Sequence, residues 1–317
     1  MAGDQQHQHA EGLSAICHVR PSTPMELMDR AFLVVRARFP QFLLLGFLFA
    51  LPEFAATVLF TYIHGVPDDS ELAQQFLGWL SAAFLLQQLP NAVVILLAIQ
   101  AFMFPRRPIR LVPLTRAALI NLPLLILTRI LAFIILFLLA NILLGALGGE
   151  LGSPGSLLGL FVASWVGAAL AYLFLMWMLM PPVALIESRG FFRGLGRSVE
   201  LMKQRFRAGW PGDLPVVRLL GILLVPGIGI LLGQLVVQGT SYALTGTNAF
   251  FGPTTPTVFL ISAGVNFITK MSVECWMYVA VALLYLECRM RREGLDLQVR
   301  LLQRQGSAAG DNVLAGL

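Results

Sequence analysis

Long apolar runs, separated by short polar connections, constrain this chain more than any other feature of its sequence. A helix rises about 1.5 Å per residue, so about 20 apolar residues cross the roughly 30 Å hydrocarbon core of a bilayer. Inside that core the backbone must satisfy its own hydrogen bonds, which leaves helices or closed barrels. The runs are continuous rather than alternating and are rich in Leu, Ala and Phe. The sequence therefore predicts an all-α, polytopic membrane protein.

We expect six transmembrane helices within one membrane domain that covers residues 21–300. Charged residues make up only 12% of the chain, about half the share that is usual in soluble proteins. Flexible polar tails are expected at residues 1–20 and 301–317. The predicted spans cover residues 41–63, 76–104, 119–147, 157–186, 214–238 and 257–287.

The distribution of Lys and Arg predicts the orientation of these spans, because cytoplasmic connections carry an excess of both residue types. Of the 22 Lys and Arg residues, 19 lie in four segments: the tail up to residue 40, residues 105–117, residues 187–213 and the tail from residue 288. Three other connections contain neither residue type: 64–75, 148–156 and 239–256. The alternation predicts that both termini face the cytoplasm, as in a multi-pass protein of the bacterial inner membrane.

Two basic segments, residues 24–39 and 191–206, have the apolar periodicity of amphipathic helices. Such helices lie in the membrane surface, where cationic side chains meet anionic headgroups. The segment after the last span is basic as well. We therefore expect contacts with lipid headgroups, or with a membrane or cytoplasmic protein partner, from a set of cationic side chains: Arg30, Arg36, Arg38, Arg197, Lys203, Arg205, Arg289, Arg291 and Arg292.

The two amphipathic segments also align with each other. R-A-F-L-V-V-R-A-R-F begins at Arg30 and R-S-V-E-L-M-K-Q-R-F begins at Arg197, with basic residues and the final Phe in matching positions. A fainter third copy is placed at Arg116. One interpretation is a parallel repeat, in two or three copies, of a basic helix followed by a helical hairpin. The other is that every cytoplasmic border attracts Arg beside an amphipathic helix.

Ionisable residues inside the predicted spans are the strongest candidates for a functional site, because each costs about 2.5–3.5 kcal/mol on insertion scales unless paired or hydrated. Four such residues stand out: Glu53, Arg129, Lys270 and Glu274. Lys270 and Glu274 are four residues apart and share a helix face, and Glu53 is a natural partner for Arg129. Their charges sum to zero, as a buried network requires. This network either clasps the helices together or binds a polar substrate, a headgroup or protons.

The remaining residues argue against catalysis. All four His residues lie outside the predicted spans, and the three Cys residues form no CxxC pair. We therefore expect no enzyme activity, no metal site and no cofactor. The net charge of +5 is explained by the topology, so nucleic acid is not an expected partner. Gly229 and Gly233 have a spacing that permits close helix packing.

Three segments resemble a family of bacterial integral membrane proteins. They are R-P-S-T-P-M-E-L-M-D-R-A-F from Arg20, G-L-G-R-S-V-E-L-M-K-Q-R-F from Gly194 and Y-L-E-C-R-M-R-R-E-G-L-D-L from Tyr285. The family is labelled as the membrane domain of glycerophosphoryl diester phosphodiesterase, with related YciC-like proteins of unknown function. Glu287 stands where the family commonly has Asp. The resemblance implies the membrane part alone, because no polar stretch here is long enough for the catalytic barrel of the fused phosphodiesterases.

We therefore expect a non-enzymatic bacterial inner-membrane protein that acts as a scaffold or membrane-organising partner. The alternative is a transporter or lipid-handling protein whose site is formed by the intramembrane charged residues. The sequence names neither a substrate nor a partner.

Overall fold

The computed structural model describes most of the predicted membrane domain. These residues are almost entirely helical and contain no strand, which confirms the predicted all-α class for them. The predicted tails 1–20 and 301–317 lie outside the described residues, as does Arg205. The described residues are 23–65, 70–103, 109–148, 164–165, 167, 172–175, 177–187, 190–203, 214–245 and 256–293.

Five helices of the described chain are long and apolar enough to cross a membrane, which indicates a membrane protein. They overlap the first, second, third, fifth and sixth predicted spans. Of the predicted fourth span, 157–186, only parts are described, and its end forms α7 (Met180–Glu187). The five candidate spans are Phe39–His64, Gln74–Met103, Leu111–Leu131, Pro215–Gly239 and Pro256–Arg292.

The described residues form two compact units. The first contains residues up to 119 and residues 221–284, and the second contains residues 120–220 and those from 285 onward. Each boundary between the units falls inside a helix. The helices that contribute residues to both units are α5 (Leu111–Gly148), α9 (Pro215–Thr245) and α11 (Cys275–Glu293).

The first unit begins with α2 (Pro24–Ala37), whose start is encoded by neighbouring residues. The hydroxyl of Thr23 accepts a hydrogen bond from the backbone N–H of Glu26, and the Glu26 carboxylate accepts one from the N–H of Thr23. This reciprocal capping box satisfies two N–H groups that a helix start leaves without partners. The helix packs against α3 and α4 and buries one face, formed by Leu27, Ala31 and Val34.

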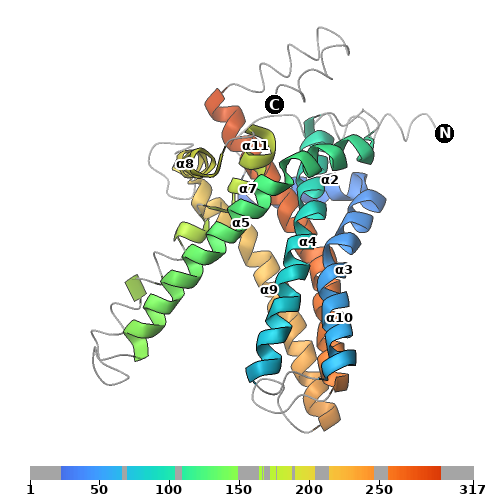
Figure 1. The fold of residues 1–317 in the computed structure, drawn as a ribbon. Coiled ribbons are helices and arrows are strands. Elements are labelled where there is room, and N and C mark those ends of the chain that lie inside the picture. Colours follow the sequence, from blue (N-terminus) through green and yellow to red (C-terminus); the bar gives the residue numbers. More distant parts are fainter. Residues whose placement is uncertain are drawn as a thin grey trace, which may run out of the picture. The chain divides into compact units, whose positions relative to one another are not determined.

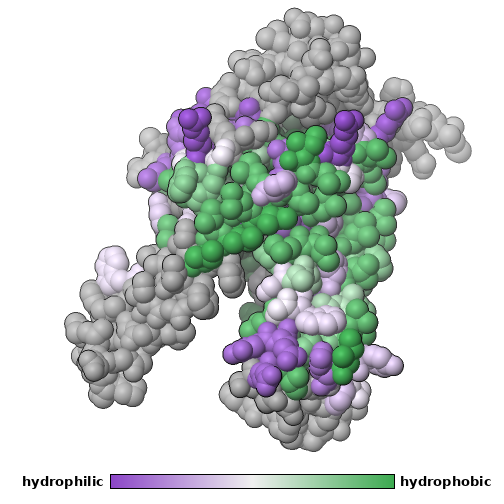
Figure 2. Space-filling model, in the orientation of Figure 1, coloured by the Kyte–Doolittle hydropathy of each residue, from purple (hydrophilic) through white to green (hydrophobic). Residues whose placement is uncertain are grey.

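Three helices of the first unit, α3 (Phe39–His64), α4 (Ser70–Met103) and α10 (Pro256–Thr269), run side by side (Figure 1). Figure 2 shows hydrophobic surface over the middle of these helices and more hydrophilic surface toward both ends. Such a band is what a bilayer requires, because the hydrocarbon core offers no water to polar groups.

A π-helical turn, Lys270–Glu274, joins α10 to α11. Such turns are rare and occur frequently at functional sites. Helix α3 approaches this turn closely at Gly46, where a Cβ atom would lie only 2.5 Å from the carbonyl oxygen of Met271. The close approach therefore requires glycine at residue 46.

Helix α9 packs against the same region through its own glycines. A Cβ atom at Gly229 would lie 3.4 Å from the side chain of Val273. One at Gly233 would lie 3.3 Å from the side chains of both Thr269 and Val265. The prediction of close helix packing at Gly229 and Gly233 is therefore confirmed.

In the second unit, α7 packs against α8 (Phe191–Met202). One face of α8 is buried and includes Arg197, Leu201 and Met202. Both basic helices are shorter than expected. The predicted helix 191–206 ends at Met202, with 204–213 outside the described residues. The predicted helix 24–39 ends at Ala37, because the backbone of Arg38 leaves the helical conformation (φ −128°) before α3 begins.

We predict that Gly46→Ala destabilises the protein by about 1–3 kcal/mol, the usual cost of overpacking a core, because the new methyl group meets the backbone of Met271. Gly78→Ala is the matched control, since nothing lies within 4 Å of a Cβ atom there and Ala is the better helix former. Thermal unfolding in detergent measures both effects. Equal unfolding temperatures for the two variants would contradict the close approach of α3 to the π turn.

Candidate functional site

The intramembrane ionisable residues of the first unit gather around one ion pair. Lys270, the first residue of the π turn, donates a hydrogen bond to the carboxylate of Glu53 on α3. The side-chain amide of Gln87 on α4 donates a second hydrogen bond to the same Glu53 oxygen at 3.2 Å. Three helical segments thus converge on one carboxylate, where the sequence had suggested Arg129 as the partner of Glu53.

Glu274 lies at the other end of the π turn and interacts electrostatically with both Lys270 and Glu53. The direct ion pair of Lys270 is with Glu53, and the expected pairing of Lys270 with Glu274 stays a prediction. Two carboxylates and one ammonium group leave this cluster with one excess negative charge when all three are ionised. Arg129 belongs to the second unit.

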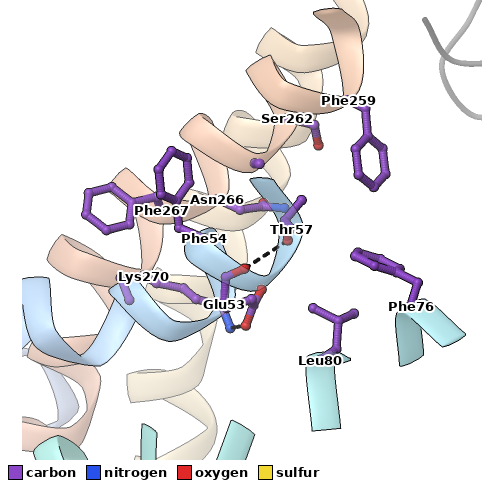
Figure 3. Close-up of a pocket in the computed structure, with 12 residues that line it drawn as sticks. Glu53, Phe54, Thr57, Phe76, Leu80, Phe259, Ser262, Asn266, Phe267 and Lys270 are labelled. Carbon is purple, nitrogen blue, oxygen red and sulfur yellow. Dashed lines mark hydrogen bonds and ion pairs between the residues drawn. The ribbon is translucent and has the colours of Figure 1, made fainter. Parts of the chain in front are cut away.

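The ion pair borders a cavity of about 170 Å³ in the first unit (Figure 3). The side chains of Lys270 and Glu53 are 21% and 29% exposed, so neither is sealed by its neighbours. One face of α10 and the first residue of the π turn line the cavity at helical spacing. These residues are Phe259, Ser262, Ala263, Asn266, Phe267 and Lys270. Residues 259–270 span about 16 Å of helix, so the cavity follows α10 for about three turns.

Aromatic rings surround the part of the cavity that lies away from the ion pair. Phe76 on α4 and Phe259 on α10 approach each other with ring centroids 5.6 Å apart. Phe60 on α3 contacts Phe76 at 5.0 Å. The polar groups Ser262 and Asn266 lie between these rings and the ion pair along α10 (Figure 3). The cavity therefore combines apolar walls with a charged end, as small-molecule sites commonly do.

A line of polar side chains continues along α4 beyond the ion pair. Gln87 and Asn91 are four residues apart and share a helix face. Both are buried, at 3% and 1% exposed. Neither the oxygen nor the nitrogen of the Asn91 side-chain amide has a hydrogen-bond partner among the described residues. A buried amide of this kind is a site for ordered water.

The second unit contains a sealed ion pair that the sequence interpretation missed. Arg218 on α9 donates to the carboxylate of Glu287 on α11 at 2.9 Å, and their side chains are only 3% and 5% exposed. Arg291 donates to the same Glu287 oxygen at 2.6 Å. Two signals could have revealed this pair. Arg218 lies inside the predicted span 214–238, and Glu287 is the last residue of the predicted span 257–287.

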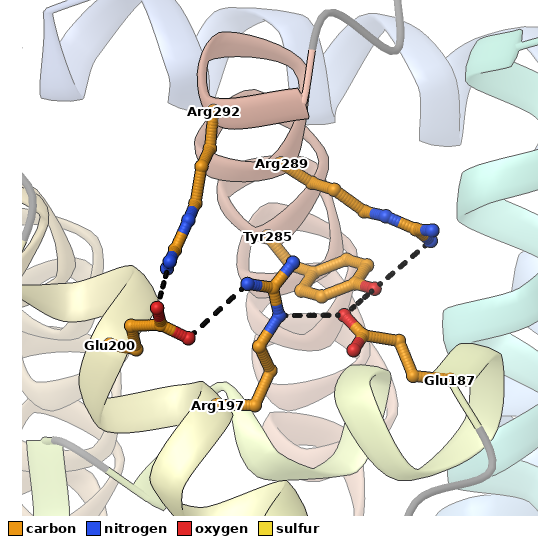
Figure 4. A network of polar contacts seen from close by, with 6 residues as sticks. All are labelled: Glu187, Arg197, Glu200, Tyr285, Arg289 and Arg292. Atoms are coloured by element: carbon orange, nitrogen blue, oxygen red, sulfur yellow. Dashed lines mark hydrogen bonds and ion pairs between the residues drawn. The ribbon is translucent and has the colours of Figure 1, made fainter.

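A second network in the same unit joins α7, α8 and α11 (Figure 4). The guanidinium of Arg197 lies between two carboxylates and donates to Glu187 and to Glu200, each at 3.3 Å. The hydroxyl of Tyr285 also donates to Glu187, at 3.1 Å. From the end of α11, Arg292 pairs with Glu200 and Arg289 donates to the Tyr285 hydroxyl.

This network changes the interpretation of several basic residues. Arg197 is only 7% exposed, so its guanidinium contacts carboxylates of the protein rather than the membrane surface. The other predicted surface contacts differ in exposure: Arg36, Lys203 and Arg292 are exposed, whereas Arg30, Arg38, Arg289 and Arg291 are half-buried.

We predict that Glu287→Gln lowers the free energy of unfolding by about 3–5 kcal/mol, because it leaves the buried guanidinium of Arg218 without its counter-charge. Replacing both residues with Met removes the charges together and should cost less. Glu71→Gln, at an exposed position, controls for the loss of one carboxylate. Chemical unfolding in detergent measures the differences. A double variant that is less stable than Glu287→Gln would show that the pair is not held by mutual compensation.

Comparisons with models of known protein families, with curated proteins and with solved structures gave no match. The family resemblance therefore stays a prediction. Two of the segments quoted for it contact each other, because Glu200 of the segment from Gly194 pairs with Arg292 of the segment from Tyr285.

Proposed function

We propose that this multi-pass membrane protein binds a small polar group at the Glu53–Lys270 ion pair, as a transporter or lipid-handling protein would. The observation that supports the proposal is the cavity of about 170 Å³ into which both charged side chains open. The bound group belongs either to a soluble solute or to a lipid headgroup. No bond is made or broken in this proposal, so the protein acts as a binder rather than as an enzyme.

The two ion pairs differ in exposure, and this difference distinguishes a pair that can bind a ligand from one that only holds helices together. Arg218 and Glu287 are sealed by their neighbours, which suits a role in holding helices together. Glu53 and Lys270 are several-fold more exposed and lie at the end of a cavity. An ion pair that only holds helices together gains no stability when water can reach it, because the attraction between two charges is stronger where water is excluded. Access is useful when a ligand must replace the water.

The charges of the cavity favour a zwitterionic ligand. An ammonium group lies beside a carboxylate, so a ligand that carries one anionic and one cationic group could pair with both. Phosphoethanolamine, which occurs free and as a lipid headgroup, has this chemistry. The amides of Gln87 and Asn91 add buried polar groups along α4 beyond the ion pair, and polar residues inside a membrane often mark the pathway of a substrate.

A scaffold is the second candidate function, supported by the surface of α2. This helix leaves Met25 and Phe32 exposed at 68% and 59%, next to the exposed Arg36. Apolar and cationic side chains on one exposed surface suit the headgroup region of an anionic membrane, or a partner protein that lies there. This surface is compatible with a binding function in the cavity.

We further propose six spans with both termini in the cytoplasm of a bacterium. In a protein in which Cys17 is changed to Ser, leaving the buried Cys275 and Cys288, we predict that Tyr62→Cys reacts with a membrane-impermeant thiol reagent in intact cells. Lys203→Cys should react only after permeabilisation. Both positions are exposed. Tyr62 lies close to the connection 64–75, which has no Lys or Arg, and Lys203 lies within the connection 187–213, which has six. Labelling of Lys203→Cys in intact cells would overturn this topology.

The cavity predicts a specific pattern of thiol reactivity. In the same Cys17→Ser protein, Ser262→Cys should react with a small water-soluble thiol reagent, because residue 262 lines the cavity. Leu260→Cys is the matched control, since residue 260 lies on the same helix and is 40% exposed on the surface that would face lipid. Equal, slow reaction of both variants would mean that the cavity is closed to water.

Ligand binding is tested as protection of Ser262→Cys by phosphoethanolamine. Adding Lys270→Met to this variant should weaken protection about tenfold or more, because a hydrogen bond to a charged group contributes about 1.5–3 kcal/mol. Exchanging the two charges, as Glu53→Lys with Lys270→Glu, keeps an ion pair that can hold α3 to the π turn. It also exchanges the positions of the ammonium group and the carboxylate, so a ligand that pairs with both would no longer fit. If that exchange leaves protection unchanged, or if phosphoethanolamine never protects, binding of this zwitterion at the ion pair is excluded.

A further inference from the structure

Arg129 presents a different problem from the charges of the first unit. It lies at the middle of α5 (Leu111–Gly148), one of the most apolar helices of the chain. The Nε atom of Arg129 is buried and has no hydrogen-bond partner among the described residues. An arginine at this depth is costly unless its charge is paired or hydrated. The Nε–H group is therefore a buried donor for which the described residues supply no acceptor.

Arg129 also lines a cavity of about 50 Å³ within the second unit. The other lining residues are Thr128, Phe174, Trp177, Met178, Met180 and Pro181. No acidic side chain is among them, and the hydroxyl of Thr128 already donates to the carbonyl of Leu125 at 2.7 Å. Guanidinium and indole N–H groups can only donate hydrogen bonds. Among the described lining residues the net charge is therefore positive, which favours an anion.

The size and surroundings of this cavity restrict the anion further. A volume of about 50 Å³ is roughly three to five times the 10–15 Å³ that one water molecule requires, which is enough for the head of an oxyanion but not for a large solute. Phe174 is 44% exposed, and Leu127 and Ile130, beside Arg129 on α5, are 49% and 40% exposed. These apolar side chains would face lipid, so the ligand reaches the site from the membrane.

We propose that Arg129 binds the oxyanion of an acyl-chain amphiphile, with two parallel N–H donors on the carboxylate or phosphate and the acyl chain along the lipid-facing surface of α5. Paired donors are the usual geometry of guanidinium with these groups. This site is independent of the Glu53–Lys270 cavity, because all of its residues lie in the second unit.

Native mass spectrometry of the full chain in an uncharged detergent tests the proposal with three probes: oleate, its neutral ester methyl oleate and dioleoyl phosphatidylglycerol. Oleate and phosphatidylglycerol distinguish a fatty acid from a phospholipid as the source of the oxyanion. We expect the wild-type protein to retain one molecule of at least one of them and no methyl oleate. Arg129→Gln should bind that ligand about tenfold more weakly or worse, because charge-assisted hydrogen bonds are lost.

Arg116→Gln is the matched control, because it removes the same charge from an exposed position on the same helix and should bind as the wild type does. Arg129→Lys keeps the charge without the planar pair of donors and should bind with intermediate affinity, which provides a second test if the neutral variant does not accumulate. The proposal is overturned if the wild type retains neither anion, if methyl oleate binds equally well, or if either Arg129 variant binds like the wild type.

Discussion

A charged side chain inside a bilayer has no water to hydrate it, and the structure of this protein depends on how each such charge is compensated. The cost of an unpaired charge exceeds that of most single packing defects. Compensation therefore decides which helices must meet. Glu53, Lys270 and Gln87 bring together α3, α4 and the π turn, and Arg218 and Glu287 bring together α9 and α11.

The ion pairs Arg218–Glu287 and Glu53–Lys270 both join a cation to a carboxylate, but they differ in how far solvent can reach them. In the second unit, the side chains around Arg218 and Glu287 exclude solvent, so the pair fixes one arrangement of helices. In the first unit, the π turn presents Lys270 and Glu274 at a position where α3 is held close by Gly46. The side chains of Glu53 and Lys270 border a cavity there and are not sealed by their neighbours. Access to water or ligand is thus a property of packing, not of residue type.

The network of Arg197 shows how a basic segment can be structural. Its position in a connection rich in Lys and Arg made it resemble a surface contact. In the folded chain its guanidinium joins the carboxylates of Glu187 and Glu200, and Arg292 returns from the end of α11 to the second of these. The Lys and Arg residues that orient a membrane protein can therefore also order its connections. Their count alone does not distinguish the two roles.

The sequence by itself determined the helical class, the approximate position of five long apolar helices and the start of α2. Each of these follows from interactions between residues that are near in sequence: apolar runs of membrane length, and a capping box between Thr23 and Glu26. It also identified Glu53 and Lys270 as candidates, because an ionisable residue in an apolar run is conspicuous without any structure.

Only the tertiary structure decided which charges pair. Glu53 and Lys270 are 217 positions apart and Arg218 and Glu287 are 69 apart, and no local pattern records such contacts. The periodicity of the sequence likewise could not predict three other features: the burial of Arg197, the cavity beside Lys270 and the π turn. Hydropathy depends on the identity of a residue and its neighbours along the chain. Pairing and access depend on distances between helices, which are fixed by close contacts such as the one at Gly46 and by the shapes of all the side chains between them.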